Sequence, residues 1–149
     1  MSRWPGNASK ERTTFGGLSR GQLMSRVRSS GNKTTEQRLA LLLRKSALHG
    51  WRRHQALSGH PDFVWCAQRV VVFVDGCFWH GHDCGKNISP ATNAAAWREK
   101  IVGNKTRDLR ITRRLRRDGW RVLRIWECLL LKRPDRCVER IRRALIAPD

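Results

Sequence analysis

The sequence predicts an α/β fold in which a mixed β-sheet is flanked by helices. Five apolar residues in a row, Val70 to Val74, are typical of a strand that is buried on both faces. The segment from Trp120 to Trp126 alternates in polarity, which favours a second long strand. Apolar residues at helical spacing precede, separate and follow these strands. We therefore expect one domain with one hydrophobic core, which a chain of 149 residues is long enough to form.

Turn and capping residues divide the chain into elements. Thr34 as N-cap with Gln37 at N3 forms a capping box that opens the first helix, and Gly50 stops it. A short link joins the strands before and after Ala67, so they are expected to form a hairpin. In order, we expect a helix over 34–49, strands over 51–55, 62–66 and 70–74, helices over 94–101 and 105–118, a strand over 120–126 and a helix over 133–147.

The charge of the chain favours a polyanion as its partner. Lys and Arg number 31 against 12 acidic residues, which gives a formal net charge of +19. The basic residues are spread through the predicted elements, so nucleic acid is a better candidate than a membrane surface. Residues 1–20 are polar, rich in Gly and Ser, and without period. We expect them to form a disordered basic arm before a single domain over 21–149.

Cysteine usage predicts a reducing compartment. The five cysteines are an odd number and lie beside histidines, which favours a metal site over disulfides. The sequence shows no signal peptide and no apolar run of transmembrane length. We therefore expect a cytoplasmic, nucleoid-associated protein of bacterial type.

Four residues have the types and spacing of a zinc site. Cys77, His82 and Cys84 lie close together in the chain, and Cys128 follows the strand that is expected beside them. Four such ligands would form a closed, structural site that fixes an irregular loop. The alternative is that Cys128 is a buried small hydrophobe. The remaining cysteines, Cys66 and Cys137, are expected in the core.

Two carboxylates are expected at one edge of the sheet. Asp62 opens one strand of the hairpin and Asp75 ends the next. Oxygen ligands of this kind suit Mg²⁺, and on a basic protein they suggest phosphodiester hydrolysis. The alternative is that Asp62 is a turn residue after Pro61 and that Asp75 forms an Asx turn. Glu36, in the first turn of the first helix, is by default only a favourable charge at a helix N-terminus.

Asp108 is expected on the inward face of its helix. It shares a stripe with Ile111, Thr112 and Leu115, and an inward carboxylate is costly unless it has a partner. His80 is the candidate partner. A carboxylate that orients an imidazole sets its tautomer and raises its basicity, as acid–base catalysis requires.

Aromatic and basic residues supply candidate DNA contacts. Phe78 and Trp79 lie in a loop flanked by glycines, where they could act as wedges that unstack base pairs or could fill the core under the zinc. The outward stripe of the Asp108 helix has few acidic neighbours, so phosphate contact is favoured over a merely solvated face. That stripe consists of Arg107, Arg110, Arg114 and Arg117.

With these residues assembled, the chain resembles the very short patch repair (Vsr) endonucleases. The resemblance covers roughly residues 21–130, and the run Asp-Gly-Cys-Phe-Trp-His is its most specific part. The matching segments, in family order, are Met24-Ser-Arg-Val-Arg, Thr35-Glu-Gln-Arg-Leu, Gly59-His-Pro-Asp-Phe, Val74-Asp-Gly-Cys-Phe-Trp-His, Asn104-Lys-Thr-Arg-Asp and Gly119-Trp-Arg-Val-Leu-Arg-Ile-Trp-Glu-Cys.

The resemblance implies a fold similar to that of restriction endonucleases and a specific activity. Such enzymes nick double-stranded DNA beside the thymine of a T:G mismatch, which arises when 5-methylcytosine deaminates. A monomer is expected, and other mismatch-repair proteins are candidate partners. The implied cofactors are a catalytic Mg²⁺ and a structural Zn²⁺.

The resemblance also implies roles for individual residues. Mg²⁺ would be bound by Asp62, with a second contact at Val74 or Asp75. His80 would be the catalytic base, helped by Asp108, and Glu36 would support the water network around the metal. The zinc ligands would be Cys77, His82, Cys84 and Cys128. Phe78 and Trp79 would intercalate beside the mismatch, and Met24 could enter from the opposite groove.

Two departures from the family pattern affect the expected mechanism. Restriction-type nucleases usually place a Lys two residues after the second acidic residue, and here that position is Cys77. Some family members carry His at the position of Asp75, so a mechanism with two histidines is not supported. His80 then carries the proton transfer.

Two alternatives to this function follow from the same residues. One is a related DNA endonuclease of different base specificity. The other is a non-catalytic, zinc-braced DNA-binding protein. The second has no need for Asp62, His80 and an inward Asp108 together, and this combination favours an enzyme.

Overall fold

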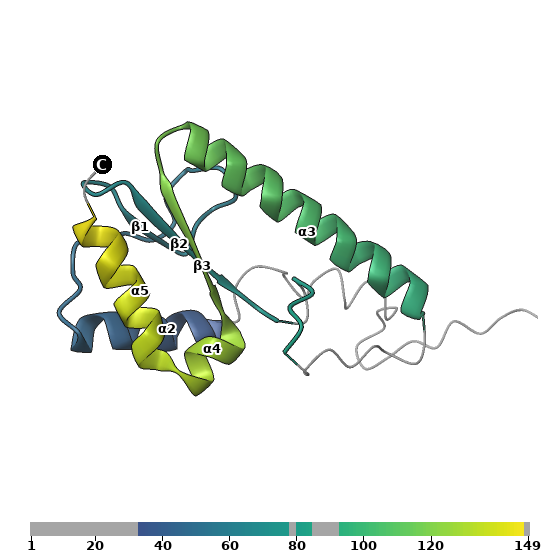
Figure 1. Ribbon diagram of the computed structural model, residues 1–149, viewed down its shortest axis with the longest axis horizontal. Coiled ribbons are helices and arrows are strands. Elements are labelled where there is room, and N and C mark those ends of the chain that lie inside the picture. Colours follow the sequence, from purple (N-terminus) through teal and green to yellow (C-terminus); the bar gives the residue numbers. More distant parts are fainter. Residues whose placement is uncertain (1–32, 78–79, 85–92, 148–149) are drawn as a thin grey trace, which may run out of the picture.

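A three-stranded mixed sheet forms the centre of the domain. The computed structural model describes residues 33–77, 80–84 and 93–147 (Figure 1). The elements in order are α2 (Lys33–Lys45), β1 (Phe63–Trp65), β2 (Val70–Asp75), α3 (Ala94–Arg117), β3 (Arg121–Trp126), α4 (Glu127–Lys132) and α5 (Pro134–Ile146). The expected arm over 1–20, and the candidate DNA contacts Met24, Phe78 and Trp79, lie outside the described residues.

The sheet has the order β1-β2-β3, with the buried strand β2 in the middle. β1 pairs with β2 in the antiparallel sense, with Val64 opposite Val71, which confirms the hairpin. β3 pairs with β2 in parallel, with Val71 opposite Val122. A parallel pair needs a crossover connection, and the long helix α3 is part of it. The predicted mixed sheet with flanking helices is therefore confirmed.

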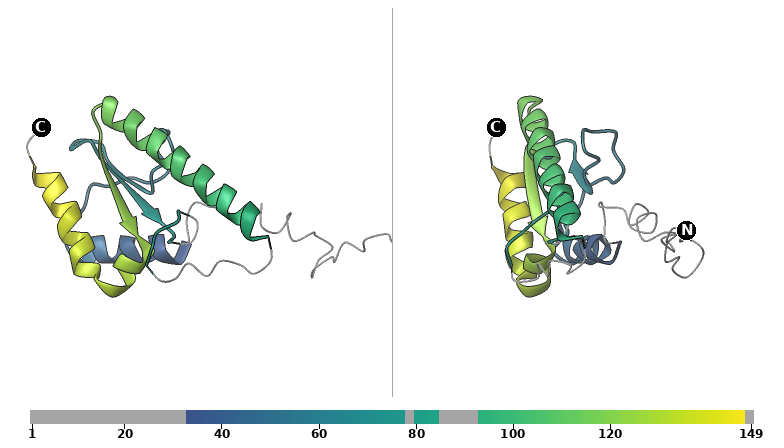
Figure 2. Two further views of the ribbon diagram at one scale, coloured as in Figure 1. Left: turned by 45° about the vertical axis from the view of Figure 1, so that its right-hand side comes forward. Right: turned by 90° about the vertical axis from the view of Figure 1, so that its right-hand side faces the viewer.

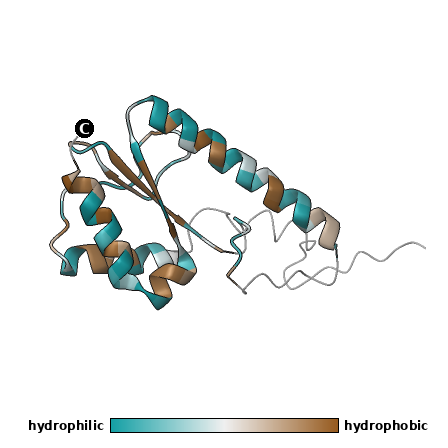
Figure 3. Ribbon diagram, in the orientation of Figure 1, coloured by the Kyte–Doolittle hydropathy of each residue, from teal (hydrophilic) through white to brown (hydrophobic). Residues whose placement is uncertain are grey.

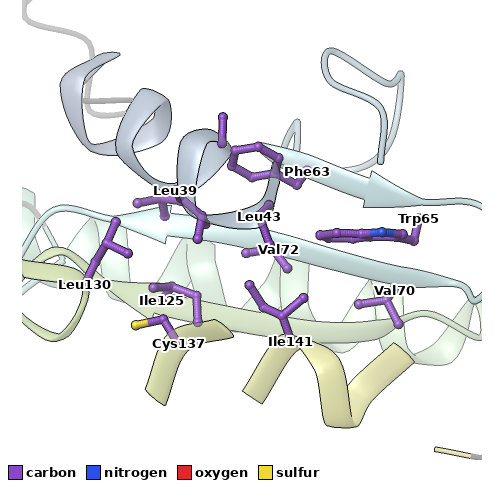
Figure 4. Close-up of a cluster of buried hydrophobic side chains, with 12 residues drawn as sticks. Leu39, Leu43, Phe63, Trp65, Val70, Val72, Ile125, Leu130, Cys137 and Ile141 are labelled. Carbon is purple, nitrogen blue, oxygen red and sulfur yellow. The ribbon is translucent and has the colours of Figure 1, made fainter. Parts of the chain in front are cut away.

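The helices cover the two faces of the sheet. In Figure 1, α3 lies along one side and α2, α4 and α5 lie along the other, and the left view of Figure 2 shows β3 between α5 and α3. Side chains of α2 and α5, such as Leu39 and Ile141, meet Val72 in the larger core cluster (Figure 4). On the other face, Leu115 of α3 packs with Phe73. The strands are accordingly mostly apolar in Figure 3, and the helices expose polar faces.

Several sequence-based boundaries were wrong. The segment 51–55 is not a strand, because only an isolated bridge joins Arg52 to Val64 and His54 adopts a left-handed φ of 54°. The two helices expected over 94–118 are one helix, α3. Gly103 lies within it with open space around its Cβ position, and a helical Gly costs only ~1 kcal/mol, so flanking turns carry the helix through.

Three smaller expectations also differ. Helix α2 begins at Lys33, so Thr34 lies in its first turn rather than at the N-cap. Helix α4 was not predicted, since it is a single short helix directly after β3. Cys66 is exposed rather than in the core, because the chain turns there and Arg69 donates its N–H to the Cys66 carbonyl (3.3 Å). Cys137 is buried, as expected.

None of the described helices could span a membrane.

Candidate metal centre and catalytic site

The candidate site forms where the parallel strands β2 and β3 end. Asp75 and Trp126 are register partners at these ends, so whatever follows the two strands begins at the same edge of the sheet. The loop over 80–84 follows β2, and α4 follows β3. The middle of α3 lies against this loop. A Cβ on Gly81, whose φ is +61°, would come within 2.6 Å of the Ile101 side chain, so a glycine is needed for this approach.

The four predicted zinc ligands come together. The ligand atoms of Cys77, His82, Cys84 and Cys128 all lie within 4.8 Å of one another. The cluster is tied across the two strand ends, because the Cys128 N–H donates to Cys77 Sγ (3.3 Å) and His82 Nδ1 lies 3.5 Å from Cys128 Sγ. His82 also stacks on Trp126, with ring centroids 4.2 Å apart. Three sulfurs and one imidazole form the donor set of a closed zinc site, and the residues fit that ion.

Burial disfavours ionisation of the Cys77 thiol when no metal ion is bound. It raises the pKa of Cys77 to about 12 in the metal-free protein. A buried thiol of this kind ionises only when a cation binds it, because a thiolate left alone in an apolar site is strongly disfavoured. A metal ion that binds Cys77 would therefore have to displace the proton of its thiol.

His80 and Asp108 form the contact that the sequence predicts. His80 Nδ1 lies 2.5 Å from Asp108 Oδ2, and both side chains are largely buried. Burial alone would lower the pKa of His80, but the hydrogen bond to Asp108 and the charge of Asp75 outweigh it and raise that pKa. Burial alone would raise the pKa of Asp108, but the bond to His80 and the charge of Arg124 lower it. The pair therefore stabilises an imidazolium beside a carboxylate.

Asp62 lies at the start of β1, beside Glu36 of α2. Its Oδ2 accepts a hydrogen bond from the Val74 N–H (2.6 Å), which ties the start of β1 to the end of β2. Burial, together with the charge of Glu36, raises the pKa of Asp62 to about 7. Glu36 in turn forms an ion pair with Arg53. Two neighbouring carboxylates of this kind are costly to ionise together, and a divalent cation would relieve that cost, so the residues fit Mg²⁺.

Asp75 has a partner that sequence reasoning missed. Both of its carboxylate oxygens lie within hydrogen-bond distance of Arg124 Nη1, at 2.9 and 2.7 Å. A second nitrogen of the same guanidinium, Nη2, lies 3.3 Å from Asp108 Oδ1. The sequence holds only part of the signal, and the strand register supplies the rest. Arg124 stands between Val122 and Trp126 on one face of a strand, and the register of β2 and β3 puts that face opposite Phe73 and Asp75.

The arginine stripe of α3 lies on the exposed face, as expected. Arg107, Arg110, Arg114 and Arg117 are all exposed. A hollow of about 500 Å³ runs along the helix, and it is lined by Thr106, Leu109, Arg110, Arg113, Arg114 and Arg117. This face points away from Leu115, which packs against the sheet. The stripe is therefore a strongly basic surface on the same helix that contributes Asp108.

Comparison with known proteins agrees with these observations. Residues 14–86 match the family described as DNA mismatch endonuclease Vsr. The chain is 47% identical to the DNA mismatch endonuclease Vsr of Escherichia coli K12 over 64% of this chain and 61% of that protein. It is 39% identical to the type II nicking enzyme V.XorIIP of Xanthomonas oryzae, over 72% of this chain and 79% of that protein.

A third relative widens the matched region. The type II nicking enzyme V.NmeDIP of Neisseria meningitidis serogroup C is 37% identical over 80% of this chain and 82% of its own length. The relatives thus include one protein named as a mismatch endonuclease and two named as type II nicking enzymes. The matched residues include α2, β1, β2 and three of the four candidate zinc ligands, Cys77, His82 and Cys84. We conclude that the chain belongs to the Vsr DNA mismatch endonuclease family.

Proposed function

We propose that this protein is a Mg²⁺-dependent endonuclease that nicks double-stranded DNA beside the thymine of a T:G mismatch. The observation that carries the proposal is the buried His80–Asp108 pair at the sheet edge. An inward carboxylate bound to an imidazole is costly to maintain and is typical of acid–base catalysis. The net charge of +19 suits DNA as the substrate.

The proton transfer falls to His80. Asp108 binds its Nδ1, which leaves Nε2 as the nitrogen that would accept a proton from the attacking water. The carboxylate would also stabilise the imidazolium that forms, which agrees with the raised pKa of His80. The chain thus supplies a base together with the group that orients it.

The metal-binding role falls to the carboxylates near β1. Asp62 would hold Mg²⁺, with a second contact at Val74 or Asp75, and Glu36 would support the surrounding water network. When bound, Mg²⁺ neutralises charge on the scissile phosphate and lowers the pKa of water. Asp62 is held in place by the Val74 N–H, so it is already oriented before a metal binds.

The zinc cluster has a structural role in this proposal. Cys77 and Cys84 would be joined by Zn²⁺ to His82 and to Cys128 at the start of α4. Because His80 lies within the same loop, the cluster would hold the base against the end of β3. Zinc removal is therefore expected to affect both folding and catalysis.

Recognition of the mismatch would use residues outside the described segments together with the α3 stripe. Phe78 and Trp79 adjoin Cys77 and His80, and would intercalate beside the mispair, with Met24 entering from the opposite groove. A mispair costs less to unstack than a Watson–Crick pair, which would favour the mismatch. Arg107, Arg110 and Arg114 would bind phosphates.

A second candidate function is nicking with a different base specificity. The names of three relatives reported above differ in kind, since two are type II nicking enzymes and one is a mismatch endonuclease. The catalytic residues would be the same in both cases. Only the base pair that is read would differ.

A nicking assay on one labelled duplex separates these functions. We expect cutting of the T-containing strand in a T:G duplex, in Mg²⁺ only, and no cutting of the matched T:A duplex. His80→Ala should abolish cutting, and His49→Ala, a change of an exposed histidine, should leave it intact. Cutting of both duplexes would favour the second function. Binding without cutting in any of several sequence contexts would contradict both.

A further inference from the structure

Arg124 contacts two of the candidate catalytic residues, Asp75 and Asp108. Its Nη1 binds both oxygens of Asp75, and its Nη2 pairs with Asp108. Its Nε donates to Thr112 Oγ1 at 3.4 Å. The guanidinium also lies over the Phe73 ring, 4.6 Å from its centroid. The side chain is only 19% exposed, so an arginine is enclosed between the sheet and α3.

The enclosed arginine balances two carboxylates that flank one imidazole. Asp108 Oδ2 lies 2.5 Å from His80 Nδ1, and Asp75 Oδ1 lies 3.7 Å from His80 Nε2. Without a cation, two neighbouring carboxylates would repel each other across the ring, and both are largely buried, at 5% and 15% exposure. Arg124 contacts both. It is therefore placed where it can fix the distance between the two acids that flank His80.

We propose that Arg124 is a positioning residue of the catalytic centre, which holds Asp75 and Asp108 on either side of His80. In this arrangement Asp75 is the ion-pair partner of Arg124 and not a ligand of the metal. This inference rests on the proposed function, because it takes His80 to be the catalytic base. It assigns Asp75 a role different from the metal contact that the family resemblance implies, because both of its oxygens already contact one nitrogen of Arg124.

The contacts require an arginine specifically. A guanidinium presents separate nitrogens in a fixed plane, and here Nη1, Nη2 and Nε each have a different partner. A lysine has one ammonium group and could bind only one of these carboxylates at a time. A lysine at this position would keep the charge and lose the spacing between the two acids.

The first test separates positioning from DNA binding in steady-state kinetics of nicking. Arg124→Gln is expected to lower kcat by about 100-fold, because a displaced base loses alignment, and to leave KM for the duplex within about twofold. Arg124→Lys should recover only a minor part of kcat. The matched control is Arg121→Gln, which removes the same charge from the same strand, where the side chain binds the carbonyls of Ala144 and Ala147 instead. An unchanged kcat in Arg124→Gln would overturn the proposal.

Asp75→Asn tests the assignment of the carboxylate. If Asp75 serves Arg124, this variant lowers kcat and leaves the Mg²⁺ concentration at half-maximal rate unchanged. If Asp75 is a metal ligand, that concentration rises, as it should in Asp62→Asn. A rise in Asp75→Asn that matches the rise in Asp62→Asn would overturn the proposal. The thermal midpoint of each variant confirms that it is folded.

A spectroscopic test does not depend on nuclease activity. The hydrogen bond from His80 to the Asp108 carboxylate should place the His80 Nδ1 proton far downfield in the NMR spectrum of the zinc-loaded full chain, and His80→Gln assigns the signal. The signal should shift or vanish in Arg124→Gln and in Arg124→Lys, and remain in Arg121→Gln. An unmoved signal overturns the positioning role. A moved signal in a protein that cuts no DNA would retain that role and would instead contradict the proposed nuclease function.

Discussion

His80 Nδ1 and Asp108 Oδ2 lie 2.5 Å apart, although the two residues are 28 positions apart in the chain. The fold explains the contact. β2 and β3 are parallel, so the chain must return along the sheet between them, and α3 makes part of that return. The helix passes the loop that follows β2 and places Asp108 beside His80. The connection that the topology requires is thus also the element that orients the candidate base.

Asp108→Asn tests whether this orientation matters for catalysis. The charge of Asp108 helps to raise the pKa of His80, so in the parent protein nicking should increase with pH through a value above 6.5. Without that charge the increase should occur at lower pH. The maximal rate should nevertheless fall by roughly 10²- to 10⁴-fold, because the amide can hold the wrong tautomer. A pH–rate profile of single-turnover nicking measures both effects.

Asp118→Asn is the matched control for this prediction. Asp118 is the C-cap residue of the same helix, is exposed, and pairs with its neighbour Arg117. Its loss should leave the pH–rate profile in place. A profile of Asp108→Asn that coincides with that of Asp118→Asn would show that the Asp108 carboxylate has no part in the reaction.

Asp62→Asn should stabilise the protein when Mg²⁺ is absent. The pKa of Asp62 is raised from 3.8 to about 7, so its ionisation opposes folding, and the free energy of unfolding falls as the pH rises between these values. An amide at this position has no charge and can still accept the Val74 N–H. At about pH 8 the variant should therefore be more stable by up to ~4 kcal/mol.

Denaturant unfolding of the zinc-loaded protein at several pH values measures this difference. The advantage of Asp62→Asn should shrink to nearly nothing at about pH 3, below the unfolded-state value of 3.8, where the carboxyl is mostly protonated in both states. It should also shrink when Mg²⁺ is added. Asp135→Asn, a change of an exposed residue in the first turn of α5, is the control. A parent protein that is more stable than Asp62→Asn at about pH 8 without Mg²⁺ would contradict the prediction.

Cys84→Ser and Cys66→Ser separate a zinc ligand from a free thiol. Cys84 belongs to the cluster that would hold zinc, and Cys66 is exposed in the turn after β1. Loss of one ligand should reduce bound zinc from about one ion per chain and lower the thermal midpoint, because the cluster joins the ends of β2 and β3. Cys66→Ser should keep both. Metal analysis by mass spectrometry and a melting curve give the result, and full zinc content in Cys84→Ser would exclude that ligand.

Sequence patterns predict the parts of this fold in which the spacing of apolar or metal-binding residues is compatible with only one structure. The run Val70–Val74 has no polar residue, so β2 had to be buried on both faces. The inward placement of Asp108 followed from helical spacing to Leu115, and its cost then required a partner. The cluster of candidate zinc ligands was predictable because Cys77, His82 and Cys84 lie close together in the chain and Cys128 follows the neighbouring strand.

The rest depended on tertiary context that no local pattern records. Arg124 reads as an ordinary exposed position of an alternating strand, and only the parallel register with Phe73 reveals that it faces Asp75. Gly103 reads as a helix end, yet α3 continues through it, because a single helical glycine costs little. Cys66 reads as the end of a buried strand, and the turn there decides its exposure.

Arg114→Gln tests whether the stripe on α3 binds DNA phosphates. Each phosphate that a basic side chain neutralises contributes about 0.9 to the slope of log K against log salt concentration. Loss of Arg114 should therefore weaken binding to matched and mismatched duplexes about equally and reduce that slope by about one. The control is Arg136→Gln, since Arg136 is exposed on α5, a helix that packs on the other face of the sheet from α3. Fluorescence anisotropy over a series of salt concentrations measures both slopes. If Arg114→Gln and Arg136→Gln lower the slope equally, binding follows net charge alone and α3 is not the DNA-facing surface.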